Sequence, residues 1–407
     1  MFTNTIQVNF LPRTEMNKAE KPLLSICMMV KNEESNLKRC LDSFLPIIHE
    51  RWCELIIVDT GSTDRTVQVA REYTDRIYHD EWADDFSKHR NFAISKAEGR
   101  KIMTVDADEE LCQDSLYILE DIILNPRYVE PTVFVTIHNF YTRDRSQYSQ
   151  MLQPRIFEND GAPIYQGMVH NRPRTKTPYL FASNVVFNHY GYLFHCNREL
   201  FRKKNDRSLP LLIKAYESNP DDLHILTHLV KTYYVAGDLD NTIRYGEEWI
   251  KKMRSVDYNE GWFAFLEVFV DLAGAYIQKG DITGAERIER ETCRYSNRLM
   301  SIYFLLGNYY SGREDERAKE YFEIGLDIAR TGGSGYEQLL TSNARIVIPE
   351  ILNWMAIYHF ARGEYEKAGQ YVNDGIRMNN NRLPLRWDIF NEANAHKRLI
   401  KNIHTEP

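Results

Sequence analysis

The chain has 407 residues, of which 43% are hydrophobic and 27% are charged, and its formal net charge is −7. A length above the ~250–300 residues at which single cores stop growing predicts two domains. The negative charge argues against nucleic acid as a partner. No apolar run reaches the ~18 residues of a membrane span, so no transmembrane segment is expected.

Residues 1–21 show no signal-peptide pattern and are expected to form a flexible leader. The six cysteines are scattered, with neither a CxxC pair nor the spacing of a zinc site. Free thiols favour a reducing compartment, so the expected location is the cytoplasm.

Residues 22–197 are expected to form an α/β domain, because short apolar runs alternate with segments of helical periodicity. In chain order the predicted elements are a strand at 23–30, a helix at 32–48, a strand at 55–59, a helix at 66–73, a strand at 76–79, a helix at 86–97, a strand at 101–110 and a hairpin at 132–157. This order predicts a parallel sheet with helices on its faces.

Residues 198–407 are expected to be all-helical, because a unit of helix, glycine-containing turn and second helix recurs there. Copies begin near His228, Leu272, Leu305 and Trp354, and their pattern matches the tetratricopeptide repeat. Stacked helix pairs of this kind leave a concave face that usually binds a partner. A plain helical bundle that supports the first domain is the alternative, and a homodimer through the repeats is a further expectation.

The strongest chemical signal is Asp106-Ala107-Asp108, which follows the apolar run IMTV and precedes Glu109 and Glu110. Carboxylates at the end of a strand face the crevice in which open α/β sheets bind ligands. Paired carboxylate oxygens suit Mg²⁺ or Mn²⁺, and such an ion can hold a diphosphate. A solvated acidic turn is the alternative interpretation.

Polar residues also follow the first two predicted strands. Asp59 can accept a hydrogen bond from the imide N–H of a uracil ring, and Ser62 can cap the next helix. Val30, Asn32 and Glu33 lie where a base or ribose would bind. A capped turn without a ligand is the alternative at this place.

Three further residues are candidates on weaker grounds. Arg90 can offset diphosphate charge, although a surface ion pair explains it equally well. His170 and His189 lie shortly before the predicted domain boundary, and a neutral imidazole can complete a metal shell begun by Asp108. Ordinary structural histidines are the alternative.

These segments together resemble the family-2 glycosyltransferases of the GT-A fold, in the bacterial branch with C-terminal tetratricopeptide repeats. The resemblance rests on SICMMVKNEE at 25–34, IIVDTGSTDRT at 56–66, DDFSKHRNFA at 84–93, VDADEEL at 105–111 and HYGY at 189–192. It implies inverting transfer of a sugar from a UDP-type nucleotide sugar, with Mg²⁺ or Mn²⁺ bound by Asp108 and His189.

The resemblance also implies the roles of the remaining candidates. The residues expected to bind the nucleotide sugar are Val30, Asn32, Glu33, Asp59, Ser62, Arg90, Asp106 and Ala107, and those expected to serve catalysis are Asp106, Asp108, His170 and Arg90. Asp59 would contact the nucleobase and Asp106 the ribose or the metal.

One departure bears on the acceptor. Asn171 stands where the relatives have a glutamate, which leaves Asp114, Glu158 and Asp160 as weak candidates for a catalytic base. A cysteine thiol, with a pKa near ~8.5, needs less help than an alcohol. The chain is similar to peptide S-glycosyltransferases of the sublancin type, so we expect a peptide or protein acceptor, with a saccharide or cell-envelope acceptor and a non-catalytic scaffold as alternatives.

Overall fold

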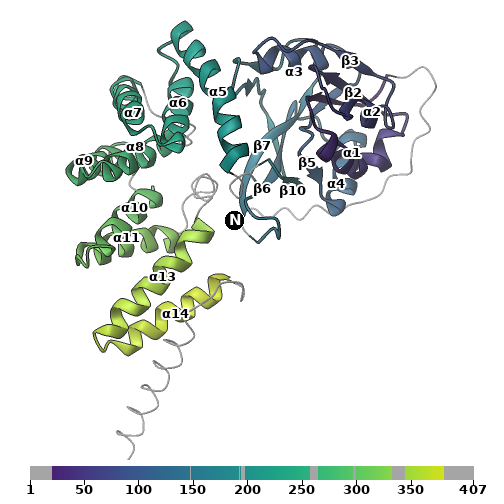
Figure 1. The fold of residues 1–407 in the computed structure, drawn as a ribbon. Coiled ribbons are helices and arrows are strands. Elements are labelled where there is room, and N and C mark those ends of the chain that lie inside the picture. Colours follow the sequence, from purple (N-terminus) through teal and green to yellow (C-terminus); the bar gives the residue numbers. More distant parts are fainter. Residues whose placement is uncertain are drawn as a thin grey trace, which may run out of the picture. The chain divides into compact units, whose positions relative to one another are not determined.

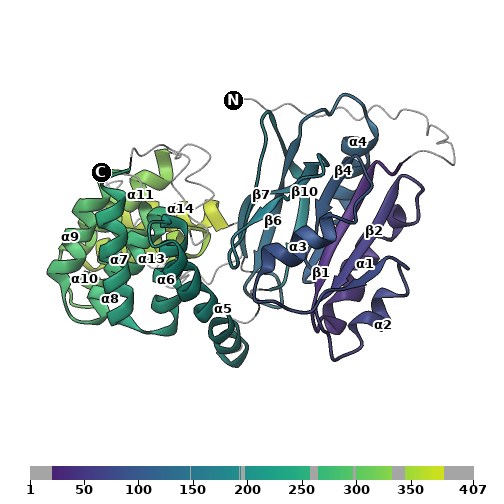
Figure 2. The same cartoon turned by 90° about the horizontal axis from the view of Figure 1, so that it is seen from above.

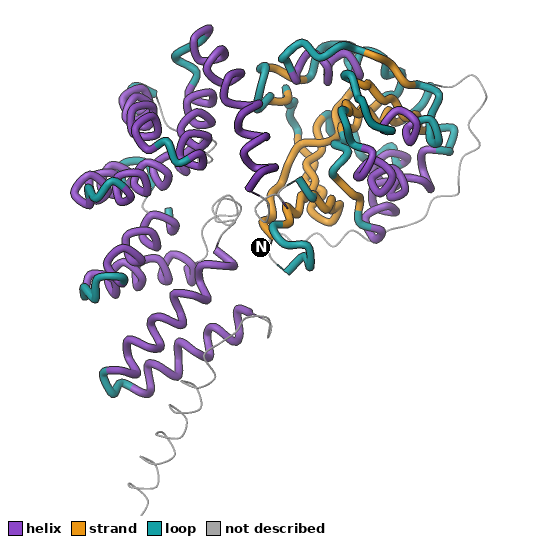
Figure 3. The backbone as a smooth tube through the Cα atoms, in the orientation of Figure 1, coloured by secondary structure: helices purple, strands orange, loops and turns teal. Residues whose placement is uncertain are grey.

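The computed structural model forms two compact units, Met1–Pro220 and Asp221–Pro407, which Figures 1 and 3 show as a sheet-containing unit and a helical one. The predicted domain boundary lies before helix α5 (Arg198–Ser218), whereas this helix clusters with the first unit. The residues that the structure describes are 21–146, 148–191, 193, 198–256, 265–296, 299–331 and 344–379. Apart from Lys21, the predicted leader lies outside them.

The first unit is built on an eight-stranded mixed sheet in the order β3-β2-β1-β4-β7-β6-β10-β5. Its strands are β1 (Leu24–Val30), β2 (Cys53–Asp59), β3 (Ile77–His79), β4 (Lys101–Thr104), β5 (Glu109–Leu111), β6 (Thr132–Phe140), β7 (Tyr148–Glu158) and β10 (Tyr179–His189). The first four strands are parallel and β6–β7 is an antiparallel hairpin, as the sequence predicts. A small second sheet pairs β8 (Tyr165–Gln166) with β9 (Arg172–Pro173).

Helices cover both faces of the sheet (Figure 2). They are α1 (Glu34–Ile48), α2 (Thr66–Ala70), α3 (Phe86–Ile94) and α4 (Leu116–Leu124), with a 3₁₀ turn at Gln113–Ser115 before α4. Strand β1 shows why both faces are covered: Ile26 and Met28 pack with α1 and α4, whereas Cys27 packs with α3. A strand buried on both faces reads as one continuous apolar run.

The predicted strand at 101–110 is wrong, because the chain forms two strands there. Strand β4 ends at Thr104, and β5 begins at Glu109 on the far side of the sheet, where it pairs antiparallel with β10. Between them the backbone turns, and the Glu109 N–H donates to the Asp106 carbonyl at 3.0 Å. Asp106-Ala107-Asp108 therefore forms the turn between two strands.

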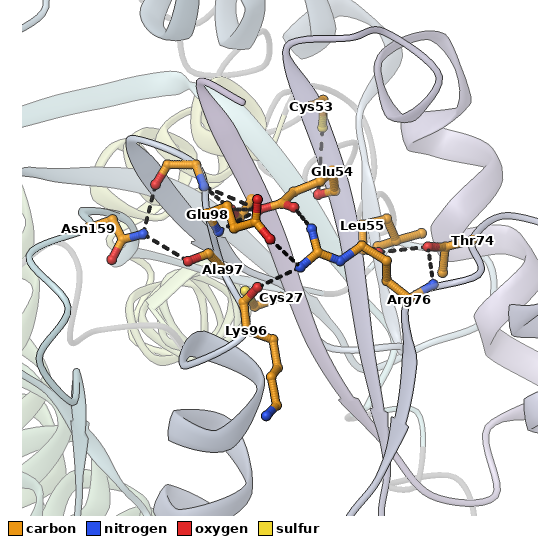
Figure 4. Close-up of polar contacts among 12 residues, drawn as sticks. Cys27, Cys53, Glu54, Leu55, Thr74, Arg76, Lys96, Ala97, Glu98 and Asn159 are labelled. Carbon is orange, nitrogen blue, oxygen red and sulfur yellow. Dashed lines mark hydrogen bonds and ion pairs between the residues drawn. The ribbon is translucent and has the colours of Figure 1, made fainter. Parts of the chain in front are cut away.

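A buried carboxylate lies at the amino ends of the parallel strands, a region called the amino edge below (Figure 4). Glu54, at the start of β2, is 8% exposed and pairs with the Arg76 guanidinium. Its second oxygen accepts hydrogen bonds from the Ser25 hydroxyl at 2.5 Å and from the Glu98 N–H at 2.7 Å. Arg76 also donates to the Lys96 carbonyl at 2.8 Å, so this edge is fixed from several directions.

The second unit consists of antiparallel helix pairs (Figure 1). The described helices are α6 (Leu223–Ala236), α7 (Leu239–Met253), α8 (Glu267–Gln278), α9 (Ile282–Thr292), α10 (Met300–Ser311), α11 (Arg317–Thr331), α13 (Ala344–Ala361) and α14 (Tyr365–Asn379). The expected order of an α/β domain followed by helical repeats is confirmed.

The recurring Gly-Asp dipeptides explain the repeat turns. Gly237 ends α6 with φ 78°, which an L side chain rarely adopts, and Asp238 then accepts a hydrogen bond from the Asn241 N–H at 3.1 Å. Gly280 and Asp281 repeat the arrangement after α8. Each dipeptide thus ends one helix and caps the next.

Candidate active site

The acidic turn lies at the carboxyl ends of the parallel strands, which is the edge where open α/β sheets bind ligands. Asp106 pairs with Arg90 of α3 at 2.5 Å and with Arg155 of β7 at 3.9 Å. Burial opposes ionisation of this carboxyl, but the two guanidinium groups outweigh it and lower the pKa of Asp106 to about 2. Arg155 also pairs with buried Glu109. Asp106 is therefore held in place as an anion.

Asp108 faces a different partner. One of its oxygens, Oδ2, lies 3.3 Å from Nε2 of His189, the last residue of β10. The other ring nitrogen of His189, Nδ1, lies 2.6 Å from Oδ1 of Asn139, an acceptor, so Nδ1 donates. Burial would lower the pKa of His189, but the hydrogen bond and charge of Asp108 outweigh burial and raise it.

Gly191 packs closely against these two groups. A Cβ at this glycine would lie 2.3 Å from the Asp108 oxygen and 2.5 Å from the His189 nitrogen, so any larger residue would displace them. Asp108 and His189 thus present two potential ligand atoms for a divalent cation 3.3 Å from each other, beside a residue that must remain a glycine.

Asp108 and His189 would supply only part of a metal shell. Across the described parts of the chain, no group of three or more His, Cys, Asp or Glu side chains is arranged to hold a metal ion. Mg²⁺ is commonly bound by one or two carboxylates together with substrate phosphates and water. Two protein ligands therefore suit an ion that arrives with a diphosphate.

The loops after β1 and β2 are joined side by side. The Asn32 N–H donates to the Ser62 hydroxyl at 2.9 Å, and the Asn32 side chain accepts from the Thr63 N–H at 2.8 Å. Asn32 has φ 55°, which asparagine tolerates better than most residues. The carbonyl of Val30 accepts from the Thr60 N–H at 3.0 Å. The sequence predicted these residues beside each other, and the structure brings them together.

Asp59, the last residue of β2, fixes the loop that follows this strand. Its carboxylate accepts hydrogen bonds from the N–H groups of Gly61 and Ser62 at 3.2 and 3.1 Å, lies 3.3 Å from Nδ1 of His79, and is 3% exposed. A carboxylate has about four lone-pair sites, so these three contacts leave room for one ligand donor. The predicted contact with a nucleobase stays a prediction.

Glu33 adds negative charge to the site. Burial raises its pKa, the hydrogen bond from Asn36 lowers it, and the charges of Asp108 and Asp106 raise it again, with a net upward shift. The charges of the acidic turn therefore act on the Glu33 carboxylate. A cation bound there would relieve the repulsion among the three carboxylates.

The start of α3 holds the segment that contains His170. Ser87 donates to the Gly167 carbonyl, and the Phe86 N–H donates to the Met168 carbonyl at 2.8 Å. His170 itself is exposed, with φ 47°. The structure therefore places His170 on a loop attached to α3, whereas Asp108 and His189 lie on the β5–β10 pair. A catalytic role for His170 stays a prediction.

The candidate bases are engaged in ion pairs or lie on the surface. Asp160 pairs with Arg174 at 3.0 Å and with Lys176 at 2.9 Å, and these hydrogen bonds hold its pKa well below the usual range. Glu158 pairs with Lys176 at 3.2 Å. Asp114 is exposed in the 3₁₀ turn before α4. These contacts argue against Asp160 as a base.

Sequence reasoning missed Arg155, Asn139 and Gly191. Arg155 and Asn139 lie within hairpin strands and belong to none of the motifs used, so only the fold brings them to the acidic turn. Gly191 stands in the recognised HYGY segment, two residues after His189. A glycine so close to a candidate ligand was the available signal for a close approach.

Residues 25–203 match the model of glycosyl transferase family 2, so the N-terminal part of the chain is a domain of that family. The family match and the sheet topology confirm the expected fold. Within the described residues, no helix combines the length and apolar character needed to cross a bilayer.

Two curated relatives each match at least half of the chain. A TPR repeat-containing protein of Synechococcus elongatus is 29% identical over 57% of this chain and 57% of its own length. The glycosyltransferase SunS from the SPbeta prophage of Bacillus subtilis is 26% identical over 50% of this chain and 48% of its own length. The chain thus spans about half the length of these relatives.

A solved structure, S. aureus TarS 1-349, aligns with 77% of this chain and 92% of its own chain. The identity is 13% and the TM-score is 0.33. A score of this size is too low to support an inference, so nothing further rests on it.

Proposed function

We propose that the protein is a metal-dependent glycosyltransferase that moves a sugar, with inversion, from a UDP-type nucleotide sugar to a peptide or protein. One observation carries the proposal: Asp108 and His189 bring two potential metal-ligand atoms to 3.3 Å from each other, in a glycosyl transferase family 2 domain. The name of SunS, a glycosyltransferase, supports sugar transfer as the reaction.

The charge distribution suits departure of a nucleoside diphosphate. Mg²⁺ or Mn²⁺ held by Asp108 and His189 would stabilise the charge that grows on the leaving diphosphate. Asn139 orients the His189 ring by accepting its Nδ1–H, which directs Nε2 toward Asp108. Arg90 and Arg155 neutralise Asp106, so the added cation is balanced chiefly by Asp108 and Glu33.

The proposed binding surface for the nucleoside is formed by the two hydrogen-bonded loops that follow β1 and β2. Asp59 would accept the imide N–H of uracil, and the backbone around Val30 and Asn32 would contact the base or ribose. The hydrogen bond that the Asn32 N–H donates to Ser62 and the one that the Asn32 side chain accepts from Thr63 fix this surface before any ligand arrives. A preformed surface reduces the entropy that binding would otherwise cost.

A cysteine is the acceptor that the side chains favour. Asn171 replaces the glutamate of similar proteins, and Asp160 is tied to Arg174 and Lys176. A thiol loses its proton more readily than an alcohol, so it needs a weaker base or none. The helical repeats are compatible with binding a polypeptide acceptor. Cytoplasmic location and a homodimer stay predictions.

The test measures UDP release and acceptor mass with a panel of UDP-sugars, with Mn²⁺ and with chelator. Acceptors are a cysteine peptide, the same peptide with serine, and an oligosaccharide. We expect metal-dependent UDP release and a mass increase on the cysteine peptide. Modification of only the oligosaccharide would contradict the peptide acceptor, and full activity in chelator would contradict the metal. Absence of both UDP-sugar binding and turnover would support a non-catalytic scaffold.

A further inference from the structure

Tyr190 connects the strand that ends at His189 to the turn that carries Asp108. It stands in the chain between His189 and Gly191, and its N–H donates to the Asp108 carbonyl at 3.0 Å. Its hydroxyl donates to the Glu110 carboxylate of β5. A displacement of Tyr190 would therefore move both candidate metal ligands.

The guanidinium of Arg39, from α1, covers the ring of Tyr190. Its central carbon lies 4.0 Å from the ring centroid, well inside the ~6 Å range of cation–π contacts. Helix α1 is itself fixed against the strand that follows the acidic turn, because the Leu111 N–H of β5 donates to the Ser43 hydroxyl at 3.0 Å. The ring of Tyr190 is thus held by a residue of a helix whose own position is set.

The charge of Arg39 is not used in an ion pair among the residues that the structure describes. One of its N–H groups donates to the Asn36 side chain at 3.0 Å, and Asn36 donates in turn to Glu33 at 2.9 Å. Its Nε is buried without a hydrogen-bond partner. An unsatisfied buried donor costs free energy and calls for an explanation. The contact with the ring of Tyr190 supplies one.

We propose that Arg39 is a positioning residue of the metal site: it holds Tyr190, and through Tyr190 it keeps Asp108 and His189 3.3 Å apart. The inference rests on the proposed function, which assigns these two side chains to a metal ion. The hydrogen bond of Arg39 goes to Asn36, so its effect on the two ligands passes through Tyr190. Residues that orient metal ligands typically change metal affinity by ~10–100-fold.

Electrostatics alone predicts the opposite effect of removing Arg39. Its guanidinium carries a fixed positive charge and lies over the residue that adjoins both candidate ligands. If this charge were its sole contribution, removing it would strengthen the binding of a divalent cation. Positioning predicts that the same change weakens binding. The direction of the change in metal affinity therefore separates the two roles.

The first test measures Mn²⁺ binding to the full-length protein by electron paramagnetic resonance of the free ion. We expect the affinity to fall at least tenfold in Arg39→Met, and by less in Arg39→Lys, which keeps a cation for the ring. The matched control is Arg145→Met. Arg145 also lies over the Tyr190 ring, at 5.3 Å, but its side chain is 51% exposed and pairs with Glu110 at 3.7 Å, so we expect less than a threefold change. Tighter Mn²⁺ binding in Arg39→Met, or equal losses in the two methionine variants, would overturn the inference.

A double-mutant cycle tests whether Arg39 acts through Tyr190. Tyr190→Leu removes the ring and should weaken Mn²⁺ binding about as much as Arg39→Met, whereas Tyr190→Phe keeps the ring and should weaken it less. The double variant Arg39→Met, Tyr190→Leu should bind Mn²⁺ no more weakly than the weaker single variant, because the second change removes nothing further. Fully additive losses would refute the route through Tyr190.

Hydrogen exchange of the Tyr190 amide gives a readout without metal. Since this N–H donates to the Asp108 carbonyl, Arg39→Met should speed its exchange at least tenfold, and Arg145→Met less than threefold. Arg39→Gln, which keeps an N–H donor for Asn36, replaces Arg39→Met if that variant does not fold. Unchanged exchange would overturn the inference. Faster exchange in a protein that binds no Mn²⁺ would support the role of Arg39 and count against the proposed metal-dependent function alone.

Discussion

Carboxylates lie beside arginines at both the amino ends and the carboxyl ends of the parallel strands, the amino and carboxyl edges of the first unit. The two edges differ in how many hydrogen-bond and ion-pair partners those carboxylates have. At the amino edge, Glu54 is 8% exposed, and its two oxygens are taken by Arg76, Ser25 and backbone N–H groups. At the carboxyl edge, the Asp108 side chain is 28% exposed and lies 3.3 Å from the His189 ring. A buried charge alone therefore does not mark a functional site; a partly exposed carboxylate beside a second potential metal ligand is the better candidate.

The sharpest test of this comparison is Asp108→Ala, for which we expect the largest change in activity. Loss of a charged metal ligand should lower metal-dependent UDP release by ~10³-fold, since several kcal/mol of charge stabilisation disappear. Thermal unfolding should change little, because the side chain is partly exposed. Asp75→Ala, a change of an exposed aspartate outside the candidate site, is the control. Activity near the wild-type level in Asp108→Ala would refute the assigned role.

Gly191→Ala tests the placement of Asp108 and His189 while both side chains are retained. The added methyl group would lie within 2.5 Å of both candidate ligand atoms and would displace them, so we expect Mn²⁺ binding to weaken by ~10–100-fold, the range seen when ligand support is disturbed. Electron paramagnetic resonance of free Mn²⁺ measures the affinity without any substrate. Gly369→Ala in α14, where a Cβ meets no atom within 4 Å, is the matched control. Equal affinities in the two variants would show that Asp108 and His189 do not hold the metal.

Glu54→Gln addresses the opposite edge and should leave metal affinity unchanged. Removing the charge of Glu54 leaves Arg76 with Glu98, 3.2 Å away, as its remaining ion-pair partner, and we expect the free energy of unfolding to fall by about 2 kcal/mol. Denaturant titration measures the change. Asp42→Asn, which breaks the exposed pair with Lys38, should cost less than ~1 kcal/mol. If both variants lost the same stability, the amino edge would not be the structural anchor proposed.

Cysteine labelling, for which we expect no change in activity, reports on whether the amino edge stays closed to solvent. Burial raises the pKa of Cys53 to about 12, and that of Cys27 also to about 12 although the charge of Arg76 opposes the shift. At pH 8 the thiolate fraction of each is ~10³-fold below that of an ordinary thiol, so alkylation should be slower by at least that factor. Exposed Cys293 is the internal reference in peptide mass spectrometry. Rapid alkylation of Cys53 would mean that the amino edge opens locally.

Patterns within short segments predicted much of the fold. The continuous apolar run of β1 and the helical spacing of Leu37, Cys40 and Phe44 in α1 identify a strand and a helix directly. Gly237 and Asp238 likewise mark a repeat turn. The missed strand break at Thr104 has a different origin: β5 is set by its pairing with β10, a long-range contact that local pattern does not contain.

The candidate site was predictable to the extent that its residues stand in motifs. Asp108 and His189 were named from the sequence, and the structure brings them together at 3.3 Å. The two arginines around Asp106 differ in this respect. Arg90 stands within a recognised motif, whereas Arg155 lies in a hairpin strand whose alternating polar and apolar residues do not identify its ion-pair partner. Which charges neutralise one another depends on packing, so the sequence could not show that Asp106 is already paired.

The pairing of β5 with β10 has a consequence for any metal ion that enters. The ladder sets Glu109 opposite His189, and the Tyr190 N–H donates to the Asp108 carbonyl at 3.0 Å. Two potential ligand atoms from distant parts of the chain are thereby brought together by backbone hydrogen bonds, and the Asn139 side chain orients the His189 ring. The entropy of closing the long intervening loop is lost when the domain folds, so an arriving ion does not have to overcome it.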